Sequence, residues 1–322
     1  MPRAVDVPAL VEQARAGMPR AVARLLSLVD HQHPALREVM AALVPHAGRA
    51  HVVGLTGPPG VGKSSTTNAV IRALRRAGRT VAVLAVDPSS PFSGGALLGD
   101  RIRMQDPSHD AGVFIRSLAS RGHLGGLSLS TPQAIRVLDA AGYDVVLVET
   151  VGVGQSEVEI AGLADTTLVL LAPGLGDGVQ AAKAGILEIG DVLVVNKADR
   201  DGAQATVRDL RAMVRMADRT TGSWRPPVIA ASAATGAGIE EVLAAVDEHL
   251  AWLAKGELRR RRVARARDEV AAIAVAQLRA RMGGLDHEHG LDEAAAAVVA
   301  GRRDPYAAAD ALLAAVRGPR PS

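Results

Sequence analysis

The stretch Gly57-Pro58-Pro59-Gly60-Val61-Gly62-Lys63-Ser64 constrains the fold of this chain more than any other feature. It directly follows the apolar run Val52 to Leu55, which has the character of a strand, and it directly precedes a segment with helical spacing. A glycine-rich loop in that position is typical of phosphate binding, because its backbone N–H groups curl around phosphate oxygens at the positive end of a helix. The sequence therefore predicts a P-loop fold that binds a nucleoside triphosphate.

The last residues of this loop supply side chains for the phosphates and for a metal ion. Lys63 is expected to neutralise the β and γ phosphates, and the Ser64 hydroxyl is expected to bind Mg²⁺. Ser65 completes the predicted phosphate-binding set, which runs from Gly57 to Ser65. The alternative is a glycine-rich turn without a ligand, and the eight-residue match between a strand and a helix disfavours it.

Short, continuously apolar runs alternate with helix-length segments from His51 onwards. Because 48% of the residues are hydrophobic but only 2% are aromatic, alanine, valine and leucine must build the core. Such runs predict an α/β fold with a mostly parallel, doubly wound sheet that is covered on both faces. The predicted strands are Val52 to Leu55, Thr80 to Val86, Val113 to Ile115, Val145 to Val148, Thr167 to Leu171, Val192 to Val195 and Val228 to Ile229.

Helical segments lie on both sides of this region in the sequence. Residues 1–47 carry apolar stripes, Val22 to Val29 and Leu36 to Leu43, and are expected to form an N-terminal helical extension before a nucleotide-binding domain over 48–253.

Residues 254–322 contain no predicted strand. We expect a long helix, a break at Gly283-Gly284, and two alanine-rich helices, the last opened by Asp304 as N-cap and Pro305 in the first turn. Three helices with too few apolar residues to form a core of their own suggest a docking or dimerisation arm, with packing back onto the sheet as the alternative.

Composition and charge argue against several classes of function. The chain has no cysteine, which removes disulfides, thiolate metal ligands and cysteine nucleophiles and makes a reducing cytoplasm the simplest location. No run of about 18 apolar residues is present, so no membrane insertion is expected. A net charge of +3 is too small for a nucleic-acid-binding surface.

One dense basic run is expected to be a solvated helix face, with contact to phosphate or an acidic partner as the alternative; it comprises Arg259 to Arg262, Arg265 and Arg267.

The choice of nucleotide depends on elements that recognise the base. Asn196-Lys197-Ala198-Asp199 follows the predicted strand Val192 to Val195 and has the Asn-Lys-x-Asp form of GTPases. The Asp199 carboxylate would accept two hydrogen bonds from guanine N–H groups, whereas adenine would leave it unpaired at a cost of a few kcal/mol. Ser232-Ala233 follows a later strand, where GTPases place a backbone N–H against the guanine O6. These elements predict GTP and GDP as ligands.

Acidic residues that follow strands near the loop are candidates for the metal site. Asp87 and Glu149 each directly follow a predicted strand, with simple helix capping as the alternative role. Asp100 lies beyond a glycine-rich stretch, and the sequence leaves open whether it binds Mg²⁺ or acts only in a switch loop. Gly152, three residues after Glu149, can contact the γ-phosphate. The predicted Mg²⁺ set is Ser64, Asp87, Asp100 and Glu149, and the predicted catalytic set is Lys63, Asp100, Glu149 and Gly152.

Fast hydrolysis is not expected from the sequence. Small GTPases place a glutamine directly after the glycine to orient the attacking water, and this chain has Val153 there, with Gln155 two residues further on. Intrinsic turnover should therefore be slow, with acceleration supplied by a partner.

Several longer motifs resemble the MeaB/ArgK/MMAA family, whose members are GTPase chaperones of adenosylcobalamin-dependent acyl-CoA mutases. The similarity runs from about residue 8 to the end of the chain. The motifs that carry it are Asp87-Pro88-Ser89-Ser90-Pro91, Gly94 to Arg101, Arg116 to Gly126, Glu149 to Glu157 and Val299 to Tyr306.

The resemblance implies a GTPase domain with an N-terminal helical extension and a C-terminal arm through which family members form homodimers. It also implies that the protein gates adenosylcobalamin loading onto the mutase and helps to release inactivated cofactor. A further switch in the family corresponds to Ala172 to Lys183 here, with Gln180 and Lys183 as candidate coupling residues.

Two other functions share the same domain plan. A metallochaperone GTPase of the urease or hydrogenase maturation type would need Cys or His ligands near the switch loops, and the absence of cysteine disfavours it. A P-loop kinase would normally favour ATP, and Asn196 to Asp199 argues against that preference. The client mutase is left open among the methylmalonyl, ethylmalonyl, isobutyryl and hydroxyisobutyryl-CoA enzymes.

Overall fold

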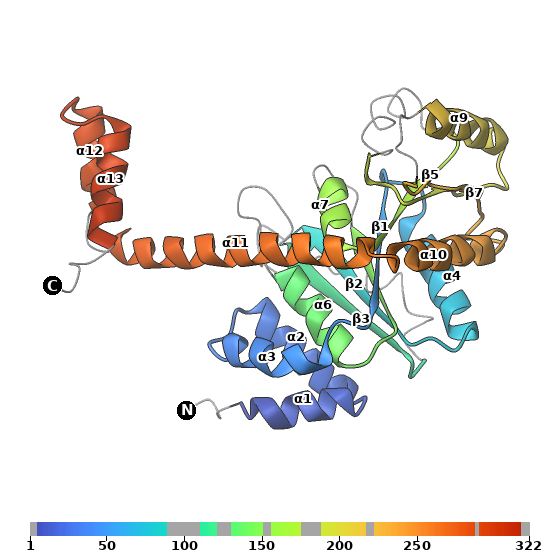
Figure 1. Cartoon of the computed structure of the whole chain (residues 1–322), viewed down its shortest axis with the longest axis horizontal. Helices are drawn as coiled ribbons and strands as arrows, with labels where there is room; N and C mark the ends of the chain where they lie inside the picture. The colour runs from blue at the N-terminus through green and yellow to red at the C-terminus, as the bar shows by residue number, and fades with distance from the viewer. Residues whose placement is uncertain are drawn as a thin grey trace. The chain divides into compact units, whose positions relative to one another are not determined.

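A seven-stranded, wholly parallel sheet lies between layers of helices (Figure 1). The computed structural model describes residues 5–88, 110–120, 130–150, 156–174, 188–216, 222–286 and 290–316. The strands are β1 His51–Thr56, β2 Val81–Pro88, β3 Val113–Ser120, β4 Val145–Thr150, β5 Thr166–Leu171, β6 Val192–Val195 and β7 Val228–Ala230. Their order across the sheet is β3-β2-β4-β1-β5-β6-β7. All seven predicted strands and the predicted α/β P-loop architecture are confirmed.

Helices cover both faces of the sheet. Successive strand residues point to opposite sides, and the residues on both sides are apolar and buried. In β4, Val146 and Val148 point to one face and pack with the N-terminal helices, whereas Val145 and Leu147 point to the other face. The strands are therefore continuously apolar rather than alternating, as the sequence showed. The covering helices are α4 Lys63–Arg76, α6 Ser130–Ala140, α7 Ser156–Leu163, α9 Ala203–Met216 and α10 Ile239–Leu253.

The N-terminal helical extension belongs to the same core as the sheet. Its predicted apolar stripe on Val22, Leu25, Leu26 and Val29 is buried against α6 and one face of the sheet. The Asp6 side chain caps the first helix by accepting a hydrogen bond from the Ala9 N–H at 3.1 Å. The elements are α1 Val7–Arg15, α2 Pro19–Asp30, α3 Leu36–Leu43 and the short 3₁₀ helix Val44–His46.

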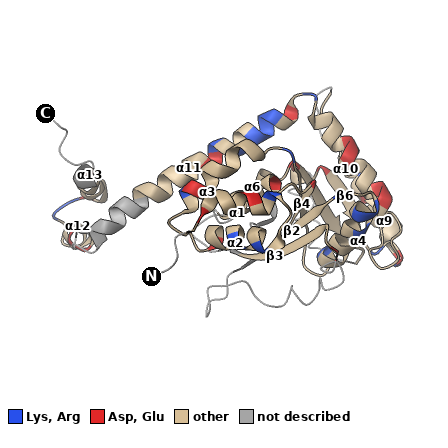
Figure 2. Cartoon of the chain, turned by 90° about the horizontal axis from the view of Figure 1, so that it is seen from below, with Lys and Arg blue, Asp and Glu red and all other residues tan. Residues whose placement is uncertain are grey.

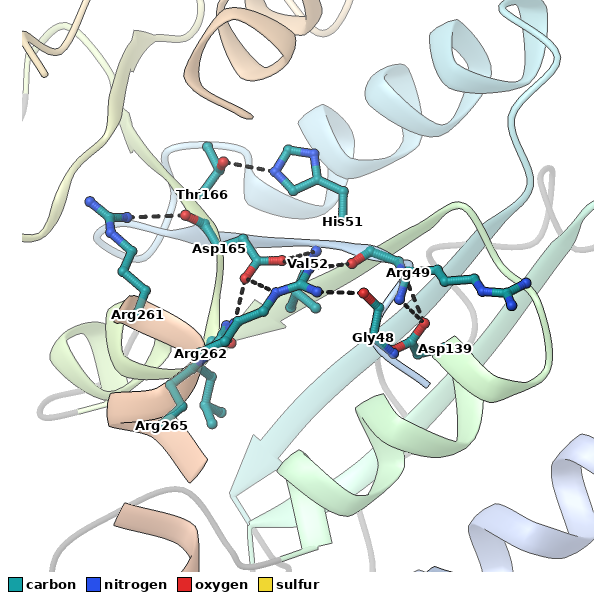
Figure 3. A network of polar contacts seen from close by, with 12 residues as sticks. Gly48, Arg49, His51, Val52, Asp139, Asp165, Thr166, Arg261, Arg262 and Arg265 are labelled. Carbon is teal, nitrogen blue, oxygen red and sulfur yellow. Dashed lines mark hydrogen bonds and ion pairs between the residues drawn. The ribbon is translucent and has the colours of Figure 1, made fainter. Parts of the chain in front are cut away.

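Arginines at the start of α11 (Glu257–Asp286) bind aspartates at the amino edge of the sheet. Figure 3 shows the arginines around one of these aspartates, Asp165. Arg262 contacts Asp165, which precedes β5, with an Nη2–Oδ2 distance of 2.8 Å, and Arg265 contacts the same carboxylate. Arg261 contacts Asp191, which precedes β6, with an Nη2–Oδ1 distance of 3.0 Å. We call these five residues the arginine anchor.

The anchor corrects the expectation that the whole basic run is a solvated face. Figure 2 shows this run in blue at the start of α11. Arg259 and Arg260 are exposed, but the three anchor arginines bind acids of their own chain. Those acids lie 70 to 100 residues earlier in the sequence. Helical spacing alone therefore could not reveal the pairing.

Two buried histidines share one hydroxyl beside the anchor. His51 Nε2 lies 2.8 Å from Thr166 Oγ1, and His249 Nδ1 lies 2.9 Å from the same oxygen. Burial lowers the pKa of each imidazole to about 4. Both rings are therefore neutral near pH 7, and the group acts as a structural link between β1, β5 and α10.

The chain divides into two compact units, Met1–Arg265 and Ala266–Ser322. The second contains the remainder of α11 together with α12 Gly290–Val299 and α13 Pro305–Val316, which contact each other. As predicted, Asp304 caps α13, accepting N–H groups of Tyr306 and Ala307 at 2.9 and 3.0 Å. Among the helices that the structure describes, none is long and apolar enough to cross a membrane.

The predicted break at Gly283-Gly284 is wrong, because α11 continues through both glycines to Asp286. Each glycine in a helix interior costs about 1 kcal/mol relative to alanine. That cost weakens a helix without ending it, so two glycines late in a 30-residue helix are tolerated.

Candidate nucleotide-binding site

The predicted phosphate-binding loop connects β1 to α4. Gly57 and Gly62 have φ values of 142° and 93°, a region that side chains rarely allow. A Cβ atom on Gly57 would lie 2.2 Å from the Leu170 carbonyl oxygen, and one on Gly62 would lie 2.5 Å from Asn196 Nδ2. Both positions therefore require glycine, and the first turn of α4 directs its N–H groups towards the loop.

Lys63 is the first residue of α4, and its side chain folds back over the loop. Its Nζ donates to the carbonyl oxygens of Gly57 at 2.7 Å and Pro58 at 3.1 Å. The ammonium is thus held beside the N-terminus of α4, so that its positive charge adds to the positive end of the helix dipole. Such a position suits a polyphosphate, whose oxygens can replace the carbonyls as acceptors.

Ser64 and Glu149 meet across the sheet edge. Glu149, only 6% exposed, lies near the end of β4, opposite Leu55 of β1. The Ser64 hydroxyl donates to Glu149 Oε1 at 2.7 Å, and the Thr67 hydroxyl donates to Oε2 at 2.8 Å. A hydroxyl beside a carboxylate provides the hard oxygen ligands that Mg²⁺ prefers, so these residues fit the predicted ion.

The other predicted metal and catalytic residues are only partly described. The backbone of Asp87 lies in β2 at the same carboxyl edge, because its neighbour Val86 pairs with Thr150 of β4. Asp100, Gly152 and Val153 lie outside the described residues.

Asn196 joins three loops that are distant in the sequence. Its Nδ2 donates to the Val61 carbonyl of the phosphate-binding loop at 2.7 Å, and its Oδ1 accepts the Ala233 N–H at 3.1 Å. Lys197, with a φ of 59°, adds a second link by donating from Nζ to the Gly60 carbonyl at 2.6 Å. The Asn-Lys-x-Asp motif identifies these two residues as base-binding, but their role as connectors depends on strand order and could not be predicted from the motif.

Asp199 and Ser232 are also brought together at this edge. A hydrogen bond from Ser232, followed by one from the backbone N–H of Asp199, lowers the pKa of the exposed Asp199 carboxyl. The carboxylate is therefore ionised at neutral pH. An ionised, solvent-facing carboxylate beside Ser232 can accept two parallel N–H groups.

Comparison with known proteins identifies the family. A model described as "Methylmalonyl Co-A mutase-associated GTPase MeaB" matches residues 22–285. The chain belongs to the MeaB family. The predicted resemblance is confirmed, and the chain is a GTPase that binds guanine nucleotides.

Relatives of this MeaB family member come from all three domains of life. A Pyrococcus abyssi protein named as a GTPase is 45% identical over 313 residues, covering 96% of each chain. GTPase ArgK of Escherichia coli is 40% identical over 257 residues, covering 77% of each chain. The mouse protein named methylmalonic aciduria type A homolog, mitochondrial, is 42% identical over 214 residues, covering 65% of this chain and 52% of its own.

A crystal structure described as an LAO/AO transport system kinase has a similar fold. Its TM-score is 0.72 at 28% identity, and the alignment covers 97% of both chains. The likeness supports the P-loop architecture of the MeaB family member.

Proposed function

We propose that this protein is a GTP-dependent chaperone that gates adenosylcobalamin loading onto an acyl-CoA mutase and protects or reactivates that enzyme. The observation that carries the proposal is the family match, because its name is that of a mutase-associated GTPase. A mouse relative named for methylmalonic aciduria supports the same class of client.

The nucleotide contacts in this proposal follow from the geometry of the loops. Residues Gly57 to Ser65 would surround the phosphates, with Lys63 on the β and γ phosphates. Asn196 and Lys197 would hold the base-binding loops against the phosphate loop, because they already bridge to Val61 and Gly60. Asp199, Ser232 and Ala233 would recognise guanine.

Mg²⁺ would be held by the Ser64 hydroxyl, with Asp87, Asp100 and Glu149 around it. When bound, the ion would neutralise charge on the β and γ phosphates. The chain's own residues would orient the phosphates and the base, and Gly152 would contact the γ-phosphate.

The second unit would form a homodimer, and the protein would act in the cytoplasm. Large apolar side chains in this unit are exposed, in contrast to the buried core of the sheet. They include Val270, Leu278, Leu291, Val299 and Tyr306. Covering such side chains stabilises association by about 25 cal/mol per Å² of apolar area.

Hydrolysis of GTP is expected to be slow alone and to rise severalfold or more with the cognate mutase. Gln180 and Lys183, which lie outside the described residues, are the proposed coupling positions. Phosphate release should be measured with and without each purified candidate mutase. Gln180→Ala or Lys183→Ala should lower the stimulated rate and leave nucleotide affinity nearly intact. An unchanged rate with every candidate mutase would remove the chaperone proposal and leave the GTPase activity standing.

A further inference from the structure

Thr67 lies one turn after Lys63 on α4, and its side chain is directed at the proposed metal site. The residue is fully buried. Its Oγ1 lies 2.8 Å from Glu149 Oε2 and 3.1 Å from the Lys63 carbonyl oxygen. A hydroxyl has one proton, so it donates to one of these acceptors at a time. The Glu149 oxygen is the closer of the two acceptors.

The two oxygens of Glu149 therefore have different partners. Oε2 is held by Thr67, and Oε1 faces the Ser64 hydroxyl at 2.7 Å. A hydrogen bond to one oxygen restricts rotation of the carboxylate about the Cγ–Cδ bond of Glu149. The other oxygen is thereby kept beside Ser64. Because Glu149 and Thr67 are both buried, water competes poorly for these contacts.

We propose that Thr67 is a positioning residue, which orients Glu149 so that Oε1 stays beside the Ser64 hydroxyl, where these residues would hold a magnesium ion. This inference rests on the proposed nucleotide and magnesium site. It assigns a role to a residue of α4 that lies outside the predicted phosphate-binding set and outside the predicted Mg²⁺ set. Loss of the hydroxyl would let the carboxylate rotate and would weaken the binding of Mg²⁺ with the nucleotide.

The test uses the full-length protein, GDP carrying a fluorescent N-methylanthraniloyl group, and buffered free Mg²⁺. In Thr67→Val, which keeps the shape and removes the hydroxyl, the Mg²⁺ concentration that half-maximally tightens nucleotide binding should rise about tenfold. Nucleotide affinity in EDTA should stay within about twofold of wild type, because the phosphate and guanine contacts remain. Thr67→Ser, which restores the hydroxyl, should return the Mg²⁺ dependence to that of wild type.

Thr66→Val is the matched control. Thr66 is also fully buried on the first turns of α4, but its hydroxyl donates to the Gly62 carbonyl at 3.0 Å instead of to Glu149. This variant should keep the wild-type Mg²⁺ dependence. If Thr67→Val is unfolded in a thermal melt, Thr67→Ala takes its place in the same titration.

Three results would overturn the proposal. A Thr67→Val protein with the Mg²⁺ dependence of wild type would show that Glu149 needs no positioning. An equal shift in Thr66→Val would show a general effect of removing a helix hydroxyl. If wild type itself shows guanine-nucleotide binding without Mg²⁺ dependence, the magnesium assignment fails first, and the role of Thr67 fails with it.

Discussion

Single polar side chains connect the loops at the carboxyl edge of the sheet to one another. Asn196 uses both the donor and the acceptor of its amide, reaching Val61 in one direction and Ala233 in the other. Its side chain is buried, so loss of either contact would leave an unpaired polar group at a cost of about 1–3 kcal/mol. The base-binding loops are therefore positioned by the phosphate loop itself.

The choice of base depends on one carboxylate in this arrangement. Asp199→Asn should weaken GTP binding by about a hundredfold and favour xanthosine triphosphate, because the amide supplies the donor that the extra xanthine carbonyl requires. Competition between the two nucleotides, measured by fluorescence, checks this exchange. Equal loss of both nucleotides would show instead that the residue is not the base discriminator.

At the scale of elements, the arginine anchor joins the start of α11 to the strands β5 and β6. Arg262 contacts Asp165, and it also donates to the carbonyls of Gly48 and Ala50, at 2.6 and 2.9 Å (Figure 3). The Asp165 side chain is fully buried. Burial would raise its pKa, but the hydrogen bond from Arg262 and the charges of Arg265 and Arg262 outweigh burial and lower it.

Arg262→Met should lower the free energy of unfolding by roughly 3 kcal/mol, because it removes one partner of a buried carboxylate. Arg260→Met is the matched control on the same helix, since the Arg260 side chain is 81% exposed and pairs only with the nearby Glu257 among the described residues. That exposed pair should contribute little. Urea unfolding of the two variants tests the anchor, and equal destabilisation would contradict it.

The sequence was informative about elements and less so about their contacts. Seven apolar runs predicted seven strands, since a buried parallel strand needs a continuous apolar run. The course of α11 was harder to predict, because Gly283 and Gly284 are unfavourable in a helix but do not forbid it. The anchor could not be predicted, since Arg262 and Asp165 are 97 residues apart in sequence.

At the scale of the whole molecule, strand order assembles the candidate site from segments that span much of the chain. With β4 and β5 on either side of β1, the phosphate loop lies between Glu149 and the base-binding loops. A crevice at the carboxyl ends of parallel strands is where ligands bind in such sheets. The local motifs were readable from the sequence, but their order across the sheet, and hence the contacts of Asn196, depends on tertiary structure.

We propose that bound GTP controls cofactor loading onto a mutase. The most direct measurement mixes the protein and an apo-mutase with adenosylcobalamin, in the presence of GTP, GDP or no nucleotide, and follows cofactor binding by its visible absorption. We predict that the rate or extent of loading differs between GTP and GDP. Lys63→Ala should abolish this difference, because the variant lacks the ammonium that would neutralise the β and γ phosphates. Loading that is identical with GTP, with GDP and without nucleotide, for every candidate mutase, would contradict the account.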